Sequence, residues 1–362
     1  MGMLGIEMAT QIQTGLAGFY SGKKVFLTGH TGFKGSWLVK MLDMLGAQVT
    51  GYALKPDTDP SLFQAAGIGK ISKSHFEDIR DLARLKAAIN KAQPEIVFHL
   101  AAQPLVRQSY ADPVYTFDTN VMGTANVLEA LRGCDSARAA VMITTDKVYE
   151  NKELDYAYKE TDRLGGYDPY SSSKACAELV ISSYRNSFFP DSGCHIASAR
   201  AGNVIGGGDW SKDRLIPDMV RSIYEGRKLE IRYPKSVRPW QHVLDPLNGY
   251  LMLGQKLHES AKYCGAYNFA PAENEKATVE QIIKSGISIL GKGEYSIFKG
   301  EKPHEAGMLR LDASKARKEL GWKPMLGTKD ALRLTFEWYN EYYGGQDPAG
   351  ALEMQIAGYY SI

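Results

Sequence analysis

Residues 24–35 read KVFLTGHTGFKG, a short apolar run that ends in a glycine-rich turn. A helical pattern with an apolar face follows at 35–45, and residues 48–53 (QVTGYA) read as a second strand. Glycines spaced G-x-x-G-x-x-G between a strand and a helix permit a tight turn and let a pyrophosphate approach the backbone, while the helix N-terminus offers free N–H groups. We therefore predict a dinucleotide-binding loop, with an empty structural turn as the alternative. Its residues are Gly29, Thr31, Gly32, Phe33, Lys34 and Gly35.

The alternation of strands and helices continues beyond this first unit. Apolar runs at 96–100, 139–144 and 195–200 read as buried strands, and helical patterns lie at 115–131 and after Tyr170. Strands that alternate with helices predict a parallel sheet covered on both faces. The expected fold class is α/β, a Rossmann-type doubly wound parallel sheet with a smaller C-terminal α/β lobe that binds the substrate.

The predicted domains follow a change of rhythm after residue 200. Loops rich in Gly, Pro, Trp and Arg come first, and then helical stretches at 279–290 and 328–343 with a strand-like piece at 267–269. We expect residues 20–200 to form the nucleotide-binding domain, to which segments around 238–260 return. Residues 201–343 should form mainly the second lobe, which includes the piece at 267–269. Residues 1–19 and 344–362 are expected to be terminal extensions, the second of them mobile.

Composition excludes several classes of function. With 362 residues, 44% hydrophobic and 23% charged, the chain is that of an ordinary globular protein. A net charge of +2 does not indicate a nucleic-acid surface, so an anionic substrate must be held by local cations. Four widely spaced cysteines without a CxxC pair favour reduced thiols, and no histidine pattern indicates a metal site. We see no signal peptide and no apolar stretch long enough for a membrane span.

The end of the second strand lacks the carboxylate that commonly binds the adenosine ribose 2′-hydroxyl. Residues 53–56 read ALKP, and the first carboxylate is Asp57. A cation at this place can accept a 2′-phosphate, so Lys55 leaves NADP open beside NAD. The interpretation of Lys55 as a solvated residue at a turn is at least as good as that of a 2′-phosphate ligand.

Two clusters of polar residues carry the predicted chemistry. Tyr170 and Lys174 stand in a Y-x-x-x-K pattern at the start of a helix, where i, i+4 spacing places both on one face. A nearby ammonium favours the phenolate, which can then take a hydroxyl proton. The run Thr144-Thr145-Asp146-Lys147 directly follows an apolar strand, and ligands of doubly wound sheets lie beyond the carboxyl ends of strands. A surface i, i+4 pair and a capped turn are the simpler structural interpretations.

These motifs resemble the extended short-chain dehydrogenases in position and order. The resemblance rests on the glycine loop, HLAAQ at 99–103, TDK at 145–147, Tyr170 with Lys174, and RAGNV at 200–204, and it runs from about residue 23 to residue 343. Within that superfamily the chain is similar to the CDP-glucose 4,6-dehydratases. Related dTDP-glucose and GDP-mannose dehydratases carry Thr-Asp-Glu where this chain has Thr145-Asp146-Lys147, and epimerases generally lack the acid.

The resemblance implies an NAD-dependent hydro-lyase of deoxysugar biosynthesis, as for lipopolysaccharide O-antigen. Tyr170 would take the O4 proton while the C4 hydride leaves, and Asp146 would protonate the departing O6. CDP-4-keto-6-deoxyglucose and water would result, with the cofactor tightly held and regenerated at each turnover. Lys147 would be the C5 base only if it is uncharged; otherwise it orients the substrate or stabilises the enolate, and another base acts.

The resemblance also implies the binding residues. Those expected for NAD outside the glycine loop are Asp78, Ile79, Leu100, Ala101, Ala102, Gln103, Thr119, Thr144, Tyr170 and Lys174. Those expected for CDP-glucose are Gln103, Arg107, Thr145, Asn203, Arg214, Leu215, Arg238 and Arg310. A cytoplasmic homodimer is implied, possibly paired into a dimer of dimers, with helices at 115–131 and 171–187 at the interface. The alternatives are a 4-epimerase, a dehydratase for another nucleotide sugar, and, remotely, a non-catalytic NAD(P)-sensing protein.

Overall fold

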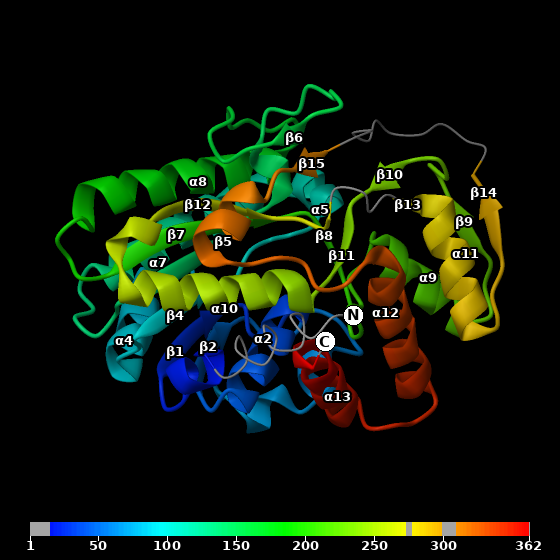
Figure 1. Ribbon diagram of the computed structural model, residues 1–362, viewed down its shortest axis with the longest axis horizontal. Coiled ribbons are helices and arrows are strands. Elements are labelled where there is room, and N and C mark those ends of the chain that lie inside the picture. The colour runs from blue at the N-terminus through cyan, green and yellow to red at the C-terminus, as the bar shows by residue number, and fades with distance from the viewer. Residues whose placement is uncertain (1–14, 273–276, 299–308, 362) are drawn as a thin grey trace.

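The structure, a computed structural model, describes residues 15–272, 277–298 and 309–361. Its centre is a seven-stranded parallel sheet (Figure 1). In spatial order the strands are β12 (Gly265–Phe269), β7 (His195–Ala201), β5 (Ala139–Ile143), β4 (Ile96–His99), β1 (Lys24–Thr28), β2 (Gln48–Ala53) and β3 (Lys73–Phe76). All neighbours pair in parallel, which confirms the predicted doubly wound α/β fold.

The strand order changes direction between β1 and β4. From β1 the chain proceeds outward through β2 to β3, and then it returns to place β4 on the other side of β1. Ligands of open parallel sheets bind at such a switch point, beyond the carboxyl ends of the strands. The loops after β1 and β4 should therefore border the site.

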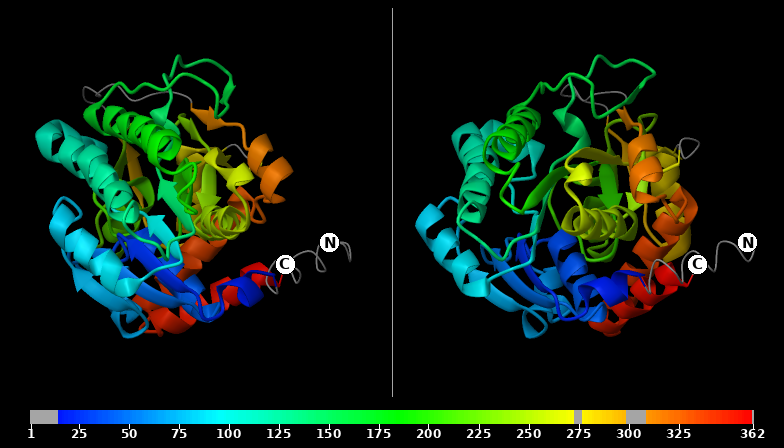
Figure 2. Two further views of the ribbon diagram at one scale, coloured as in Figure 1. Left: turned by 90° about the vertical axis from the view of Figure 1, so that its left-hand side faces the viewer. Right: turned by 60° about the vertical axis from the view of Figure 1, so that its left-hand side comes forward.

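Successive side chains of each strand enter opposite cores, as the two-residue repeat of a strand requires. In β1, Val25 and Leu27 join the core beneath α2 (Phe33–Met44) and α10 (Leu244–Glu259), whereas Phe26 joins the core on the other face. Figure 2 shows the sheet between these two layers of helices. The second layer consists of α4 (Leu82–Ala92), α7 (Gly123–Leu131) and α8 (Pro169–Phe188).

The remaining helical segments are short or lie outside the sheet layers. They are α3 (Leu62–Ala65), η1 (Ile68–Lys70), α5 (Val106–Ala111), α6 (Pro113–Phe117), η2 (Asp118–Met122), η3 (Asp146–Val148), α9 (Leu215–Tyr224), η4 (Ala261–Tyr263), α11 (Val279–Leu290), η5 (Ala316–Leu320), α12 (Thr328–Tyr343) and α13 (Pro348–Tyr360). The helix expected at 115–131 is the continuous run α6–η2–α7, whose middle part, η2, is a π-helical turn.

Four two-stranded sheets lie outside the central sheet. They pair β6 (Ala157–Tyr158) with β15 (Arg310–Leu311), β8 (Asn203–Ile205) with β11 (Trp240–His242), β9 (Leu229–Ile231) with β14 (Tyr295–Ile297), and β10 (Val237–Arg238) with β13 (Ala277–Thr278). Helices α9, α11 and α12 lie with β9, β10, β13 and β14 at one end of the molecule, whereas β6 and β15 lie near α8 (Figure 1).

Two expectations from the sequence are wrong. The strand-like piece at 267–269 is part of β12, which pairs with β7 at the edge of the central sheet instead of belonging to the second lobe. The tail after Gly344 is not a mobile extension, because α13 buries Leu352, Ile356 and Tyr359. An ion pair between Lys40 Nζ and Glu353 Oε1, 2.5 Å apart, also connects α13 to α2. Most of the other terminal extension, residues 1–14, lies outside the described residues.

Candidate active site

The glycine loop lies between β1 and α2, as predicted. Gly29 has φ of +78°, which L-residues rarely adopt, and a Cβ there would meet the Ala101 nitrogen at 2.7 Å. A Cβ on Gly35 would lie 2.0 Å from the Gly29 oxygen. Gly32 is the N-cap of α2 and supplies no side-chain cap, so the first N–H groups of the helix keep no side-chain partner. Such a bare, close-packed helix start fits a pyrophosphate.

The loop after β4 faces the glycine loop across the switch point. It contains Leu100, Ala101, Ala102 and Gln103, all predicted to contact the cofactor. The Ala101 N–H donates to the Thr28 hydroxyl at 3.2 Å, which joins the two loops. The Gln103 amide donates to Thr116 Oγ1 at 2.9 Å and accepts from the Leu105 N–H at 2.6 Å. Gln103 therefore shapes this loop, and its contact with a ligand stays a prediction.

The predicted adenine end of the site lies after β3. Asp78 pairs with Arg80 at 2.7 Å, and its carbonyl accepts from Tyr52 Oη at 3.2 Å. Ile79 is buried and packs against Gly123 of α7. Thr119 is buried as well, and its hydroxyl has no hydrogen-bond partner. An orphaned buried hydroxyl at this place leaves a donor for a bound ligand.

The start of α8 positions the predicted Tyr170–Lys174 pair. Asp168 caps the helix by accepting from the Ser171 N–H at 3.0 Å, and Pro169 occupies the first turn. Tyr170 and Lys174 follow one turn apart and are 8% and 5% exposed. The Lys174 ammonium donates to the Ile143 carbonyl at the end of β5, 3.1 Å away. The predicted Y-x-x-x-K pair therefore lies beside the strand that carries the second cluster.

The second cluster forms η3 directly after β5. Thr145 Oγ1 donates to Asp146 Oδ1 at 2.9 Å, and Lys147 Nζ lies 3.1 Å from the same oxygen. Asp146 is 3% exposed, and its other oxygen faces Gly202, where a Cβ would approach it to 3.1 Å. The Lys147 side chain is partly exposed, at 35%. Thr144 points away from this group and bonds to Glu178 at 2.5 Å.

Electrostatics joins these groups into one centre. Burial raises the pKa of the Tyr170 phenol, whereas Lys147 and the Thr145 hydroxyl lower it. Burial lowers the pKa of Lys174 to about 8, and Glu178 opposes that shift. Burial and then Arg214 lower the pKa of Lys34 to about 7, with Asp146 acting in the opposite direction. Lys34, predicted only as part of the glycine loop, therefore also interacts electrostatically with Asp146, Lys147 and Lys174.

Several of the residues predicted to bind the substrate lie in the segment from β8 to α9. Asn203 begins β8, and Leu215 is the first residue of α9. Arg214, the N-cap of α9, pairs with Asp209 at 3.1 Å, and its charge influences the Tyr170 phenol. Arg107 of α5 forms an ion pair with Asp213 at 2.6 Å. The sequence analysis missed Asp209, although it stands in the GGGDW segment that precedes Arg214.

Two further arginines were predicted to bind phosphate. Arg310 lies in β15 and pairs with Asp155. Arg238 belongs to β10, but its side chain lies outside the described part of the structure. Contact of either guanidinium with a diphosphate stays a prediction.

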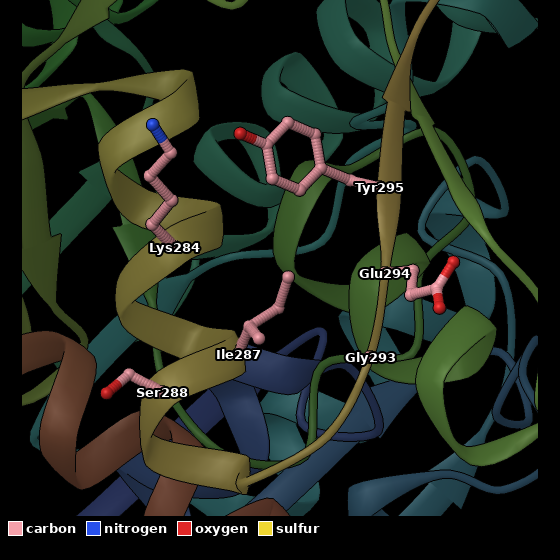
Figure 3. A pocket seen from close by; sticks show the side chains of 6 residues that line it. All are labelled: Lys284, Ile287, Ser288, Gly293, Glu294 and Tyr295. Carbon is pink, nitrogen blue, oxygen red and sulfur yellow. The ribbon is translucent and has the colours of Figure 1, made fainter.

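A pocket lies between α11 and β14. It is lined by Lys284, Ile287, Ser288, Gly293, Glu294 and Tyr295, none of which was predicted to be functional (Figure 3). Lys284 and Tyr295 both bind Glu280, at 2.9 and 2.7 Å, so their polar ends are paired with protein. Within the described ranges no His, Cys, Asp and Glu cluster is arranged to bind a metal ion. No helix in those ranges is long and apolar enough to cross a bilayer.

The matching family model and two of the curated relatives are described as nucleotide-sugar 4,6-dehydratases. The family model described as GDP-mannose 4,6 dehydratase matches residues 26–335. A CDP-glucose 4,6-dehydratase of Salmonella typhimurium is 48% identical over 350 residues, covering 95% of this chain and 98% of that protein. A dTDP-glucose 4,6-dehydratase of the same organism is 26% identical, covering 93% and 99%.

Solved structures share the fold. A dTDP-glucose 4,6-dehydratase from Streptomyces venezuelae with NAD bound superposes with a TM-score of 0.74 at 24% identity, covering 90% of this chain and 99% of that one. A UDP-glucose 4-epimerase from Stenotrophomonas maltophila, also with NAD bound, gives 0.77 at 22% identity, covering 89% and 99%. At these identities the likeness concerns the architecture.

Proposed function

The chain belongs to the GDP-mannose 4,6-dehydratase family, and we propose that it is an NAD-dependent CDP-glucose 4,6-dehydratase. The observation that carries the proposal is the buried Asp146 beside Tyr170 and Lys174, because an acid at that place serves dehydration and not epimerisation. The 48% identity to a CDP-glucose 4,6-dehydratase over nearly both whole chains supports the choice of sugar nucleotide. The product would be CDP-4-keto-6-deoxyglucose, a precursor for deoxysugar biosynthesis.

The glycine loop fits a dinucleotide, since the bare N-terminus of α2 and the close approach of Gly29 to Ala101 leave no space for side chains. Bound NAD would supply the hydride acceptor at C4 and the hydride donor at C6. Thr119, with its unpartnered buried hydroxyl, and the N–H groups of Phe33 and Lys34 would hold it.

In the first step Tyr170 takes the proton from O4 as the C4 hydride departs. The buried phenol is a weak acid on its own, so it needs cations to become a phenolate. Lys147 acts in that direction across η3, and the Lys174 ammonium lies one turn away on α8. The C4 ketone that results acidifies the hydrogen at C5.

The elimination assigns opposite roles to Asp146 and Lys147. Lys147 takes the C5 proton as an uncharged amine, and Asp146 gives a proton to the departing O6, which leaves as water. Lys147 Nζ and Asp146 Oδ1 are 3.1 Å apart. Moving one proton across that hydrogen bond converts the ion pair into an amine and a carboxylic acid, which are the two forms that the elimination requires. Hydride return from the bound cofactor to C6 and protonation at C5 would complete the turnover.

The diphosphate of the substrate needs cations, because the chain as a whole has a net charge of only +2. Arg214 is held by Asp209, and Arg107 of α5 pairs with Asp213, the residue before Arg214. We assign these two arginines, with Asn203 and Leu215, to the sugar diphosphate. Arg238 and Arg310 are further candidates on β10 and β15.

The proposal includes a cytoplasmic homodimer. Apolar side chains of α6 and η2 are exposed, among them Val114 at 78% and Met122 at 52%, and Leu179 of α8 is 59% exposed. A four-helix interface that pairs these helices with those of a second copy would cover them. Light scattering at micromolar concentration should give the mass of a dimer, and a monomeric mass would refute this part of the proposal.

The function is tested by a panel of CDP-, dTDP-, UDP- and GDP-glucose with purified protein and no added reductant. CDP-glucose should lose one water and give the alkali-sensitive 4-keto chromophore. Tyr170→Phe, which keeps the ring but loses the hydroxyl, should give none. If only another sugar nucleotide were turned over, the substrate assigned here would be wrong. If the product were a C4 epimer formed without loss of water, the reaction would be epimerisation and not dehydration.

A further inference from the structure

Glu178 is a buried carboxylate that neither the cofactor nor the substrate is expected to touch. It lies on α8 four residues after Lys174, so Tyr170, Lys174 and Glu178 follow one another on the same face of the helix. Its side chain is 4% exposed. A buried charge is costly to keep unless it is fully partnered, so its contacts have to be accounted for.

Both carboxylate oxygens of Glu178 are saturated. Arg200 of β7 donates through Nε to one oxygen at 2.9 Å and through Nη2 to the other at 2.8 Å. Thr144 adds a hydroxyl bond of 2.5 Å to the first oxygen, and Ser198 adds one of 2.7 Å to the second. The pair is therefore neutral as a whole, and it fixes the residue that directly precedes the Thr145–Lys147 cluster.

Arg200 extends this arrangement into the protein. Its Nη1 donates to Tyr149 Oη at 2.7 Å, and Tyr149 donates to Asn268 Oδ1 of β12 at 2.8 Å. Tyr149 comes directly after η3, so the guanidinium holds the far end of the segment whose near end Thr144 anchors. The Glu178–Arg200 ion pair thus hydrogen-bonds to residues at both ends of the segment that carries Asp146 and Lys147.

The Glu178 carboxylate of this pair also affects the protonation of Lys174. Charged or titratable groups on three neighbouring elements interact with the Lys174 ammonium, namely Glu178 on α8, Lys34 on α2 and His99 on β4, and Tyr170 lies one turn before it on α8. His99 is uncharged at neutral pH, because burial lowers its pKa to about 3. Glu178 favours the ammonium, whereas Lys34 opposes it.

We propose that Glu178, balanced by Arg200, is a positioning residue that keeps Lys174 charged and holds the Thr145–Lys147 segment in place during C4 oxidation. Without the carboxylate, Arg200 would be an uncompensated cation next to position 178, which lies one helical turn from Lys174. Without the guanidinium, Glu178 would attract the ammonium more strongly. The two removals should therefore act in opposite directions. This inference rests on the roles proposed above for Tyr170 and Lys174.

The experiment isolates the oxidation with CDP-6-deoxyglucose, which has no O6 to eliminate, so that reduced cofactor accumulates. The rate of cofactor reduction is measured by its absorbance from pH 6 to pH 10 for the parent enzyme, E178Q and R200M. In the parent, the rate should fall as pH rises through about 8, where the Lys174 ammonium is lost. In E178Q this alkaline limb should move to lower pH by about one unit, a tenfold change in the ionisation constant.

R200M should move the alkaline limb to higher pH. Because the two expected shifts are opposite in sign, one variant is enough to test the proposal if the other does not fold. Asp245→Asn is the matched control, because Asp245 is also a fully buried carboxylate, on α10, bonded to Met325, Leu326 and Tyr359. It should alter thermal stability and leave the limb in place. The inference would be overturned if both variants had their alkaline limb at the same pH as the parent enzyme and differed from it only in stability. Absence of cofactor reduction in the parent enzyme would instead reject the proposed function.

Discussion

Asp146 has the surroundings of a group that must exchange a proton without leaving its place. It is 3% exposed, and one oxygen receives both the Thr145 hydroxyl and the Lys147 ammonium. Asp146→Asn keeps the size of the side chain and an oxygen for these bonds, but it removes the transferable proton. We expect loss of O6 to slow by about 100-fold or more, as is typical for removal of a general acid.

Binding separates this role from its alternative. Calorimetric titration of Asp146→Asn with CDP-glucose should give nearly the parent affinity, because no contact to the nucleotide is removed. An unchanged rate of water loss combined with an affinity weakened by about tenfold, or 1.4 kcal/mol, would make Asp146 a binding residue.

Lys147 is the point at which this chain departs from the Thr-Asp-Glu pattern. Lys147→Met retains the length of the side chain without the amine, so it should still oxidise C4 but lose exchange of the C5 hydrogen with solvent deuterium. Nuclear magnetic resonance of the substrate and product follows both events. Lys147→Glu, which restores the commoner residue, should recover part of the exchange if the carboxylate reaches C5. Exchange at the parent rate in Lys147→Met would reduce the lysine to an electrostatic role.

At the scale of elements, the cap of α8 determines where Tyr170 points. Asp168 accepts from the Ser171 N–H at 3.0 Å and from the Ser171 hydroxyl at 2.6 Å. Asp168→Ala should lower the free energy of unfolding by about 1 kcal/mol, the usual value of such a cap, and should also slow C4 oxidation. Asp81→Ala removes the same kind of cap from α4.

Urea denaturation and single-turnover oxidation compare these two caps. Asp81→Ala should cost a similar amount of stability and leave the oxidation rate unchanged, because α4 carries no part of the catalytic centre. Equal rates in both variants would show that the cap of α8 has no influence on Tyr170.

The elements near the N-terminus were the most predictable from sequence. A β-branched run, a glycine turn and an apolar helical face coincide at 24–45, so local pattern and final structure agree. β12 was assigned to the wrong lobe, because a strand of five residues carries no information about its partner and the pairing with β7 is formed across some 70 residues of chain. Helix α13 was missed because alanines and glycines obscure its apolar side chains, which become recognisable only against α2 and α10.

The site was predictable in its parts and not in its connections. Tyr170, Lys174 and Asp146 stand in recognisable motifs, and parallel strand ends bring them together. The Lys147–Asp146 pair and the saturation of Glu178 by Arg200 depend on distances that no spacing in sequence encodes. Asp209, which holds Arg214, was overlooked for the same reason.

At the scale of the whole molecule, Asp245 joins the C-terminal helix to the core. It accepts from Tyr359 of α13 and from the Met325 and Leu326 N–H groups. Burial raises its pKa from 3.8 to about 7, while these bonds act in the opposite direction. A carboxyl whose pKa is raised in the folded state stabilises the fold below the unfolded value near 4, and this contribution is lost as pH rises through about 7.

Asp245→Asn should therefore cancel a pH dependence of stability. Its free energy of unfolding, compared with that of the parent, should rise between pH 4 and pH 7, by on the order of 4 kcal/mol for a full shift of this size. Urea denaturation across that range measures the difference. A constant difference between the two proteins would mean that Asp245 does not titrate there.

The central claim is that one enzyme molecule oxidises C4, removes water across C5 and C6, and returns the same hydride to C6. CDP-glucose carrying deuterium at C4 tests it most directly, in light water and without added cofactor reductant. The account predicts a 4-keto-6-deoxy product that has lost one water and holds the deuterium at C6, with a solvent hydrogen at C5. Deuterium that stays at C4, or that is lost to solvent, would contradict it.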